Sequence, residues 1–196
     1  LHIHALGPTQ RVPLHIHPHA DEFTVIVSGN VLTRHWYEEA DSLQHVDLEQ
    51  VPGTLLQIPS KAGHEWLNIG SEFQANLVFS VPAFYGNLYL EDGDKKLLEG
   101  STPTIVPPTL LQLQTGATSQ LQEIGSSQVR AFLTKGQLDL ESHEMNNYLY
   151  VSSGMGRFET DTKVAEIRQG HLLYLPAGTA ASLITESQLR GYLFSL

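Results

Sequence analysis

Three histidines and a carboxylate are concentrated in residues 14–22, which read LHIHPHADE. His15 and His17 alternate along a segment with strand character, so their side chains project from the same face. Pro18 then turns the chain, and Glu22 begins the next apolar run. Imidazole and carboxylate groups that converge on one point are suitable ligands for a divalent transition metal.

A second cluster lies in residues 53–68, GTLLQIPSKAGHEWLN. A glycine and a proline frame a short strand that leads to His64, and Asn68 follows on the same face. Together the clusters offer three imidazoles and one carboxylate, which suit a divalent first-row metal. A single carboxylate leaves the ion with net positive charge, which can polarise a substrate oxygen or bind dioxygen where coordination positions stay open. The alternative is a hydrogen-bonded polar core or a vestigial site.

Short runs of β character surround both clusters. Examples are EFTVIV, TLLQIP, NYLYVS and HLLYLP, separated by Gly, Pro, Asn and Asp at a spacing typical of sandwiches and barrels. Helical character is limited to residues 87–100 and 109–114. We therefore predict an all-β chain with minor helix.

A proline-rich stretch, STPTIVPPT at residues 101–109, divides the chain near its middle. Proline cannot donate to a central sheet ladder, so such a stretch usually connects units. The same punctuation recurs on each side, as GTLLQIP (53–59) and GHLLYLP (170–176), and EFTVIVSG resembles NYLYVSSG. We predict a duplicated β unit, with domains at residues 1–105 and 106–196.

Composition narrows the possible partners. The 196 residues are 41% hydrophobic and 16% charged, as in a globular protein, and carry a formal net charge of −10. Proteins that bind nucleic acids or anionic membranes require a basic patch, so the negative net charge argues against both kinds of partner. The absence of cysteine excludes disulfides, iron–sulfur clusters and thiolate chemistry. No apolar run approaches the roughly 20 residues that span a bilayer.

Both clusters resemble the motifs of the cupin superfamily. Residues 15–29 are similar to the first motif, His-x-His-x(3,4)-Glu-x(6)-Gly, and residues 53–68 to the second, Gly-x(5)-Pro-x-Gly-x(2)-His-x(3)-Asn. The chain departs from these motifs at two positions. Thr9 stands where the glycine that precedes the first motif would fall, with Gly7 nearby, and Lys61 stands where the second motif usually has glycine. The resemblance implies a small double-stranded β-helix (jelly-roll) barrel that binds one divalent ion of Fe, Mn, Ni, Cu, Co or Zn. It implies these metal ligands: His15, His17, Glu22 and His64.

The second half resembles a cupin unit that has lost its site. Alignment of the repeated glycines and prolines puts Leu140, Ser142, Asn147 and Ala181 at the four ligand positions. Leucine and alanine cannot ligate a metal. The whole chain therefore resembles a bicupin with an intact N-terminal metal site and a degenerate C-terminal unit without metal.

Strand alternation suggests which side chains share the cavity with the metal. With Glu22 pointing inward, the substrate pocket is expected to include these residues: Thr24, Ile26, Trp66, Asn68, His35 and Tyr37. His19 is expected to face solvent or the cavity mouth. His2 and His4 alternate in the first LHIH and favour an edge strand beside the barrel over a second metal site.

The resemblance implies a metal-dependent enzyme that acts on a small hydroxylated or enolisable substrate. Residues 7–23, GPTQRVPLHIHPHADEF, most resemble the quercetinase-like dioxygenases, in which Glu22 would be both a ligand and the catalytic base, with dioxygen as the second substrate. The same ligand set also serves non-oxidative lyases, cyclases and isomerases. A non-catalytic bicupin, for binding or storage, is the third alternative.

The outward face of residues 23–27 is too apolar for a water-exposed strand, which predicts packing on the other unit or on a second subunit of a homodimer. The chain begins at Leu1, which leaves a removed targeting segment open. The absence of an Asn-x-Ser/Thr sequence slightly favours the cytoplasm.

Overall fold

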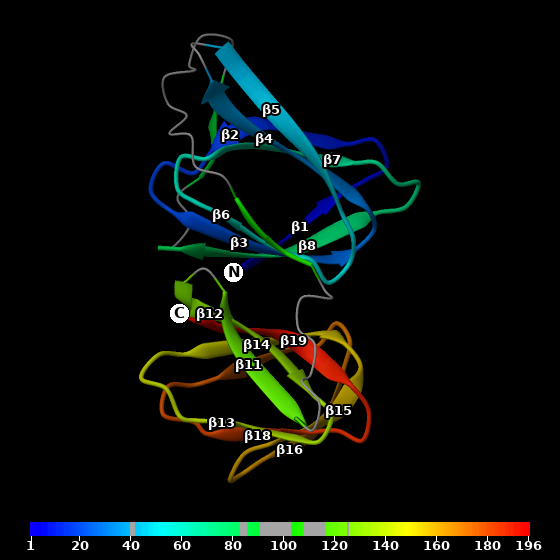
Figure 1. Cartoon of the computed structure of the whole chain (residues 1–196), viewed down its shortest axis with the longest axis vertical. Coiled ribbons are helices and arrows are strands. Elements are labelled where there is room, and N and C mark those ends of the chain that lie inside the picture. The colour runs from blue at the N-terminus through cyan, green and yellow to red at the C-terminus, as the bar shows by residue number, and fades with distance from the viewer. Residues whose placement is uncertain (40–41, 83–85, 91–102, 108–116, 125) are drawn as a thin grey trace. The chain divides into compact units, whose positions relative to one another are not determined.

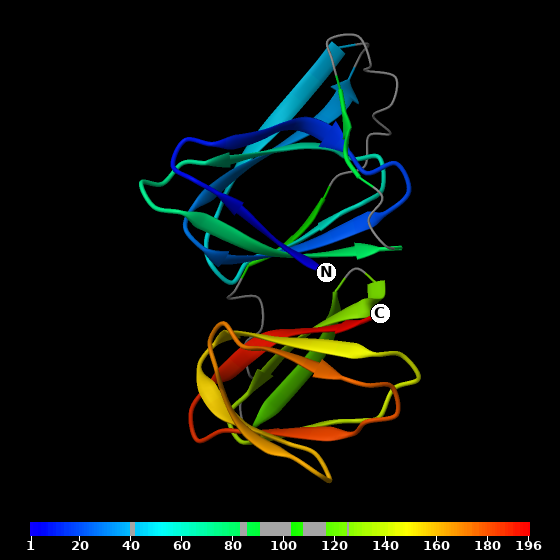
Figure 2. The ribbon, with the colours of Figure 1, turned by 180° about the vertical axis from the view of Figure 1, so that it is seen from behind.

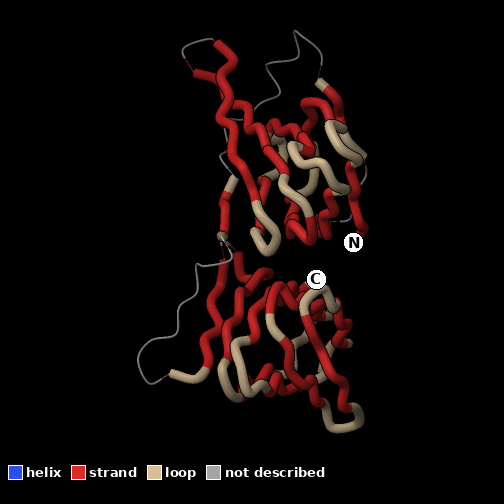
Figure 3. Tube along the Cα trace, turned by 90° about the vertical axis from the view of Figure 1, so that its right-hand side faces the viewer, coloured by secondary structure: helices blue, strands red, loops and turns tan. Residues whose placement is uncertain are grey.

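A computed structural model describes residues 1–39, 42–82, 86–90, 103–107, 117–124 and 126–196. The described residues form strands, turns and loops without any helix, so none of their segments is a helix that could cross a membrane (Figure 3). The all-β prediction is confirmed. The predicted minor helix is not found where it can be checked: Leu88–Tyr89 is a strand, and residues 91–100 and 109–114 lie outside the described residues.

The chain divides into two compact units, Leu1–Pro107 and Pro108–Leu196. The first unit contains these strands: β1 (His2–Leu6), β2 (Arg11–Ile16), β3 (Asp21–Ser28), β4 (Val31–Glu39), β5 (Ser42–Gln50), β6 (Leu55–Ile58), β7 (Gly63–Asn68), β8 (Gln74–Val81), β9 (Leu88–Tyr89) and β10 (Thr104–Val106). They form two antiparallel sheets, in the orders β1-β8-β3-β6-β10 and β5-β4-β7-β2-β9 (Figures 1 and 2).

The second unit contains these strands: β11 (Ser119–Ile124), β12 (Ser126–Thr134), β13 (Gln137–Leu140), β14 (Asn147–Ser153), β15 (Met155–Glu159), β16 (Val164–Arg168), β17 (Leu172–Leu175), β18 (Ala181–Ile184) and β19 (Leu189–Ser195). Its sheets have the orders β11-β12-β19-β14-β17 and β13-β18-β15-β16. A hydrocarbon cluster that includes Phe132, Leu140, Leu149 and Leu193 forms its core.

The two units repeat the same strand order. The run β8-β3-β6 corresponds to β19-β14-β17, and β5-β4-β7-β2 corresponds to β16-β15-β18-β13. The glycines that suggested the repeat adopt matching left-handed conformations: φ is 74° at Gly29 and 89° at Gly154, and 87° at both Gly53 and Gly170. Glycine is favoured there because a Cβ would be strained at positive φ. Equivalent positions in the two units can therefore be identified by strand register.

Two local features of the first unit bear on the sequence-based predictions. The proline-rich stretch is more than a connection, because Thr104–Val106 forms β10 and pairs with β6. Strand β3 is buried on both faces: Phe23 and Val25 on one face and Thr24 and Ile26 on the other are at most 1% exposed.

Candidate metal centre

Three histidines meet inside the first unit. His15 lies in β2, His17 directly follows that strand, and His64 lies in β7, where it pairs in register with His15. One nitrogen from each ring can be chosen so that all three lie within 4.8 Å of one another, and all three side chains are buried. Within the described part of the chain, no other group of three His, Asp or Glu side chains is this close.

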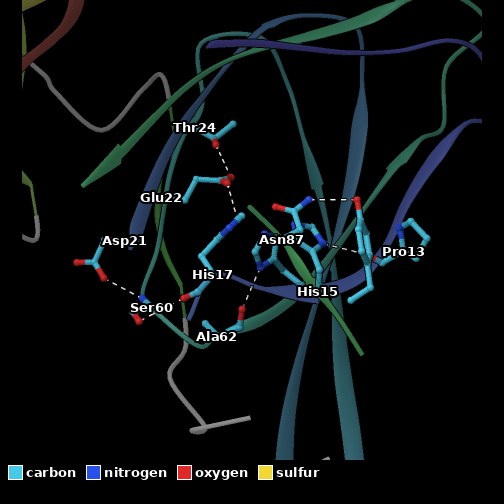
Figure 4. Close-up of polar contacts among 11 residues, drawn as sticks. Pro13, His15, His17, Asp21, Glu22, Thr24, Ser60, Ala62 and Asn87 are labelled. Carbon is cyan, nitrogen blue, oxygen red and sulfur yellow. Dashed lines mark hydrogen bonds and ion pairs between the residues drawn. The ribbon is translucent and has the colours of Figure 1, made fainter. Parts of the chain in front are cut away.

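Backbone carbonyls fix the orientation of two of the rings. The Nδ1 of His15 lies 2.8 Å from the carbonyl oxygen of Pro13, and the Nδ1 of His64 lies 2.9 Å from that of Ala62 (Figure 4). An Nδ1–H that donates to a carbonyl leaves Nε2 as the lone-pair nitrogen, the arrangement that metal-binding histidines usually have. The Nε2 of His64 is buried and has no hydrogen-bond partner among the described residues. A metal ion would satisfy it.

Glu22 reaches the histidines from the opposite sheet. Its Oε2 lies 2.8 Å from the Nε2 of His17, and its Oε1 accepts a hydrogen bond of 2.6 Å from the Thr24 hydroxyl (Figure 4). The side chain is 5% exposed. The structure thus brings the three predicted histidines together. Glu22 is not a member of that close group and contacts it through His17.

Electrostatics keep the site in the form that binds a cation. Burial lowers the pKa of His15 to about 4 and that of His64 well below its usual value, so both rings are neutral at pH 7. Burial alone would raise the pKa of Glu22, but the hydrogen bond from His17, the nearby His64 and the Thr24 hydroxyl outweigh it and lower the pKa to about 2. Neutral imidazoles beside an ionised carboxylate are the protonation states that ligation requires.

The turn at residues 60–61 is hydrogen-bonded to the loop that carries His17. The Lys61 N–H donates to the carbonyl of His17 (2.9 Å), and the Ser60 N–H donates to the carboxylate of Asp21 (2.8 Å). Lys61 has a φ of 63° and Thr9 a φ of 61°, and these are the two positions where the cupin motifs usually have glycine. The backbone therefore keeps the left-handed conformation although the glycine is absent, at a cost of about 1–2 kcal/mol per residue.

A cavity of ≈ 60 Å³ adjoins the histidines between the two sheets. In addition to His15, His17 and Glu22, its walls contain Val12, Trp66, Val78, His2, His4, Asn76 and Asn87. A second, outer pocket of ≈ 160 Å³ shares His17 and Asn87 with it and includes His19, as expected for a residue at the mouth. Asn87 therefore stands between the inner cavity and the outer pocket.

Of the six expected pocket residues, only Trp66 is among those that line the inner cavity. Asn68 instead has a structural role, since its amide donates to the carbonyls of Leu6 and Glu72. Thr24 is hydrogen-bonded to Glu22, and Ile26 packs in the apolar cluster.

The two aromatic candidates on β4 also lie away from the inner cavity. His35 is buried, and its Nε2 lies 3.0 Å from the Thr33 hydroxyl. Tyr37 lies farther along the strand and is partly exposed. Alternation identifies the face on which a side chain lies but not its position along the barrel.

The sequence did not identify His2, His4 and Asn76 as cavity residues. His2 and His4 belong to β1, which is the edge strand of its sheet, as predicted. Asn76 belongs to β8, where nothing in its neighbours marks it as functional. The only sequence signal was the alternation of His2 and His4 in the first LHIH. Only the pairing of β1 with β8 shows that these residues line the cavity beside the histidine triad.

Comparisons with known proteins agree on the architecture. No protein-family model and no curated protein matches the chain. Among solved structures, salicylate 1,2-dioxygenase from Pseudaminobacter salicylatoxidans is similar with a TM-score of 0.68 and 14% identity, over 98% of this chain and 69% of that chain. The 7S globulin of Momordica charantia is similar with a TM-score of 0.64 and 14% identity, over 99% of this chain and 72% of that chain. The chain has the cupin fold.

Strand register identifies the residues of the second unit that correspond to His15, His64 and Glu22. Leu140 pairs with Ala181 in the register in which His15 pairs with His64, and both residues are buried. Asn147 takes the place of Glu22, since each pairs with a serine of the neighbouring strand, and Asn147 accepts a 2.7 Å hydrogen bond from Ser195.

Proposed function

We propose that the protein is a metal-dependent cupin dioxygenase that acts on a small hydroxylated or enolisable organic molecule. The observation that carries the proposal is the buried His15–His17–His64 triad, in which the Nε2 of His64 lacks a partner among the described residues. The similarity to salicylate 1,2-dioxygenase, of which adducts with gentisate are known, supports the reaction class (TM-score 0.65, 14% identity, 98% of this chain and 66% of that chain).

The four ligands would be His15, His17, Glu22 and His64, in a cupin domain of residues 1–105. Three imidazoles and one carboxylate accept Fe, Mn, Co, Ni, Cu or Zn, so the donor set leaves the choice of metal open. Residues 106–196 would form the cupin domain without metal, because Leu140 and Ala181 offer hydrocarbon at ligand positions.

Glu22 would also act as the general base that accepts a proton from the substrate. It is ionised at neutral pH, lines the cavity, and is held by the Thr24 hydroxyl. A carboxylate with a pKa of about 2 is a weak base, so it takes a proton efficiently only from a substrate hydroxyl that has become acidic. A bound cation supplies that acidity by stabilising the oxyanion and, in the oxidative reaction, also provides a site for dioxygen. Trp66 and Val78 contribute apolar walls to the same space.

The finer assignment to the quercetinase-like branch depends on whether a molecule as large as a flavonol fits the site. An apolar cavity of about 150 Å³ holds one benzene molecule, whereas the inner cavity measures ≈ 60 Å³. A flavonol would therefore place its reacting end in the inner cavity and its remaining ring in the outer pocket, beyond Asn87. A non-oxidative lyase, cyclase or isomerase uses the same groups without dioxygen.

The test is oxygen uptake by metal-loaded protein with a panel of flavonols, gentisate, catechols and diketones. Consumption of oxygen with any of them supports the dioxygenase, and the preferred compound identifies the branch. Turnover without oxygen consumption would indicate a lyase or isomerase. His64→Ala, which removes one ligand, is the matched control and should be inactive.

A non-catalytic bicupin is the second candidate, favoured by the similarity to a 7S globulin. Metal content separates the two classes. Protein purified without a histidine tag that neither contains nor takes up a transition metal would favour the non-catalytic protein.

A further inference from the structure

The inner face of the β1-β8-β3 sheet presents a row of polar groups to the cavity. Asn76 in β8 pairs in register with His4 of β1 on one side and with Ile26 of β3 on the other. Paired residues of antiparallel strands project to the same side of a sheet. Both His4 and Asn76 line the inner cavity, and they come from the sheet opposite the one that carries His15 and His64.

Asn76 has an unused hydrogen-bonding group. The side chain is 0% exposed, and its Oδ1 accepts a short hydrogen bond from the amide of Gln74, which orients it. Its Nδ2 is buried and has no hydrogen-bond partner among the described residues. A buried donor without a partner costs about 1–3 kcal/mol. A ligand in the cavity that Asn76 lines could supply the missing acceptor.

The second unit shows that the fold does not require these polar residues. The pair equivalent to His4–Asn76 is Phe132–Gly191, identified by the same register. A Cβ on Gly191 would lie 1.9 Å from the Tyr150 carbonyl oxygen and 2.6 Å from the Phe132 ring, so the second unit has no room for a side chain at the position of Asn76. The same wall is therefore hydrocarbon where the triad is absent and polar where the triad is present.

Charge defines the kind of ligand further. A divalent ion beside the Glu22 carboxylate leaves one net positive charge, and no Lys or Arg is among the described residues that line the cavity. Burial lowers the pKa of His4, so at neutral pH its ring can donate a hydrogen bond without adding charge. These features suit an anion of charge −1 with one further, uncharged oxygen. Room for about four to six water-sized groups limits the part of the ligand that enters.

We propose that Asn76 and His4 form an oxygen-binding subsite, which selects small monoanions that carry a second, neutral oxygen, such as 2-hydroxy acids, 2-oxo acids and the enolates of diketones. The anionic oxygen lies toward the histidine triad, and the second oxygen accepts hydrogen bonds from Asn76 Nδ2 and His4. The inference rests on the proposed function, because it assumes a cation at the triad.

The experiment compares glycolate with acetate on the zinc-loaded protein by titration calorimetry. Both probes are monoanions, and glycolate adds one hydroxyl group. We expect the wild-type protein to bind glycolate about tenfold more tightly than acetate, which corresponds to one to two net hydrogen bonds. Asn76→Leu and the pair His4→Phe with Asn76→Gly, which copies the wall of the second unit, should remove that preference and leave acetate binding unchanged.

Ile3→Phe is the matched control. Ile3 is 74% exposed on the outer face of β1, so the added ring does not reach the cavity, and the preference for glycolate should persist. Variants that hold zinc and keep the full preference for glycolate would overturn the subsite, since chelation of zinc alone would then explain it. Equal loss of glycolate and acetate would also overturn it. Failure of the wild-type protein to take up zinc would instead contradict the proposed function itself, and the subsite would fall with it.

Discussion

Replacing His64 by leucine should change the stability of the metal-free protein little and that of the metal-saturated protein much more. His64 is fully buried, and its Nε2 has no partner among the described residues. In the metal-free protein, His64→Leu removes that unsatisfied nitrogen, a gain of about 1–3 kcal/mol, and leaves the buried carbonyl of Ala62 without its donor, a loss of about 1–3 kcal/mol. We therefore expect the free energy of unfolding of metal-free His64→Leu to lie within about 2 kcal/mol of that of the metal-free wild type.

In the metal-saturated comparison His64→Leu should be clearly less stable than the wild type. A ligand present at 1,000 times its dissociation constant stabilises the folded state by about 4 kcal/mol, and His64→Leu should lose that stabilisation together with the metal. The assay is denaturant unfolding of both proteins, each after chelator treatment and again with excess zinc. His35→Leu is the control, because His35 is equally buried on the neighbouring strand but is not a member of the triad. It should keep the response to zinc.

A loss of several kcal/mol in metal-free His64→Leu would refute the reasoning. That result would mean that the histidines form a hydrogen-bonded polar core, in which each ring already has its partners.

Three further predictions concern the groups around the triad. Lys61 has a φ of 63°, a left-handed conformation that favours glycine. Lys61→Gly should therefore raise the free energy of unfolding by about 1 kcal/mol, measured as a higher melting temperature, whereas Lys61→Ala should bring no such gain. Burial lowers the pKa of His15 from 6.5 to about 4, so the unfolded chain takes up the proton first as the pH falls. The free energy of unfolding of the metal-free protein, measured by denaturant titration, should therefore fall by about 3 kcal/mol from this group between pH 6.5 and 4. A constant free energy of unfolding over this range would contradict the burial of His15 as a neutral ring. Glu22→Gln should lower turnover of the preferred substrate by about 100-fold or more, and an unchanged rate would exclude Glu22 as the base.

The grouping of the histidine triad could be predicted because its signal is local. His15 and His17 share a strand face by alternation, and the spacing to Glu22 and His64 follows two short motifs. The strand positions of Leu140 and Ala181 were likewise available from the repeated glycines. In the structure these two residues pair with each other, as His15 pairs with His64.

The cavity wall could not be predicted, because it depends on long-range pairing. Asn76 and His4 are adjacent only because β1 pairs with β8, and no local pattern specifies that register. Asn68 shows a second limit of local patterns: it is buried, as alternation predicts, but its amide donates to the backbone of Leu6 and Glu72, and both contacts depend on the tertiary fold. Leu88–Tyr89 resembled a helix locally and became a strand through pairing with β2, which is tertiary context.

The central claim is that one transition-metal ion is held by His15, His17 and His64, with Glu22 beside it. The most direct measurement is anomalous diffraction from crystals of the untagged protein loaded with zinc, recorded above and below the absorption edge of the metal. We expect one anomalous peak in each chain, within about 2.0–2.2 Å of a nitrogen of each of the three histidines. A peak elsewhere, or no peak after saturation with the metal, would contradict the claim.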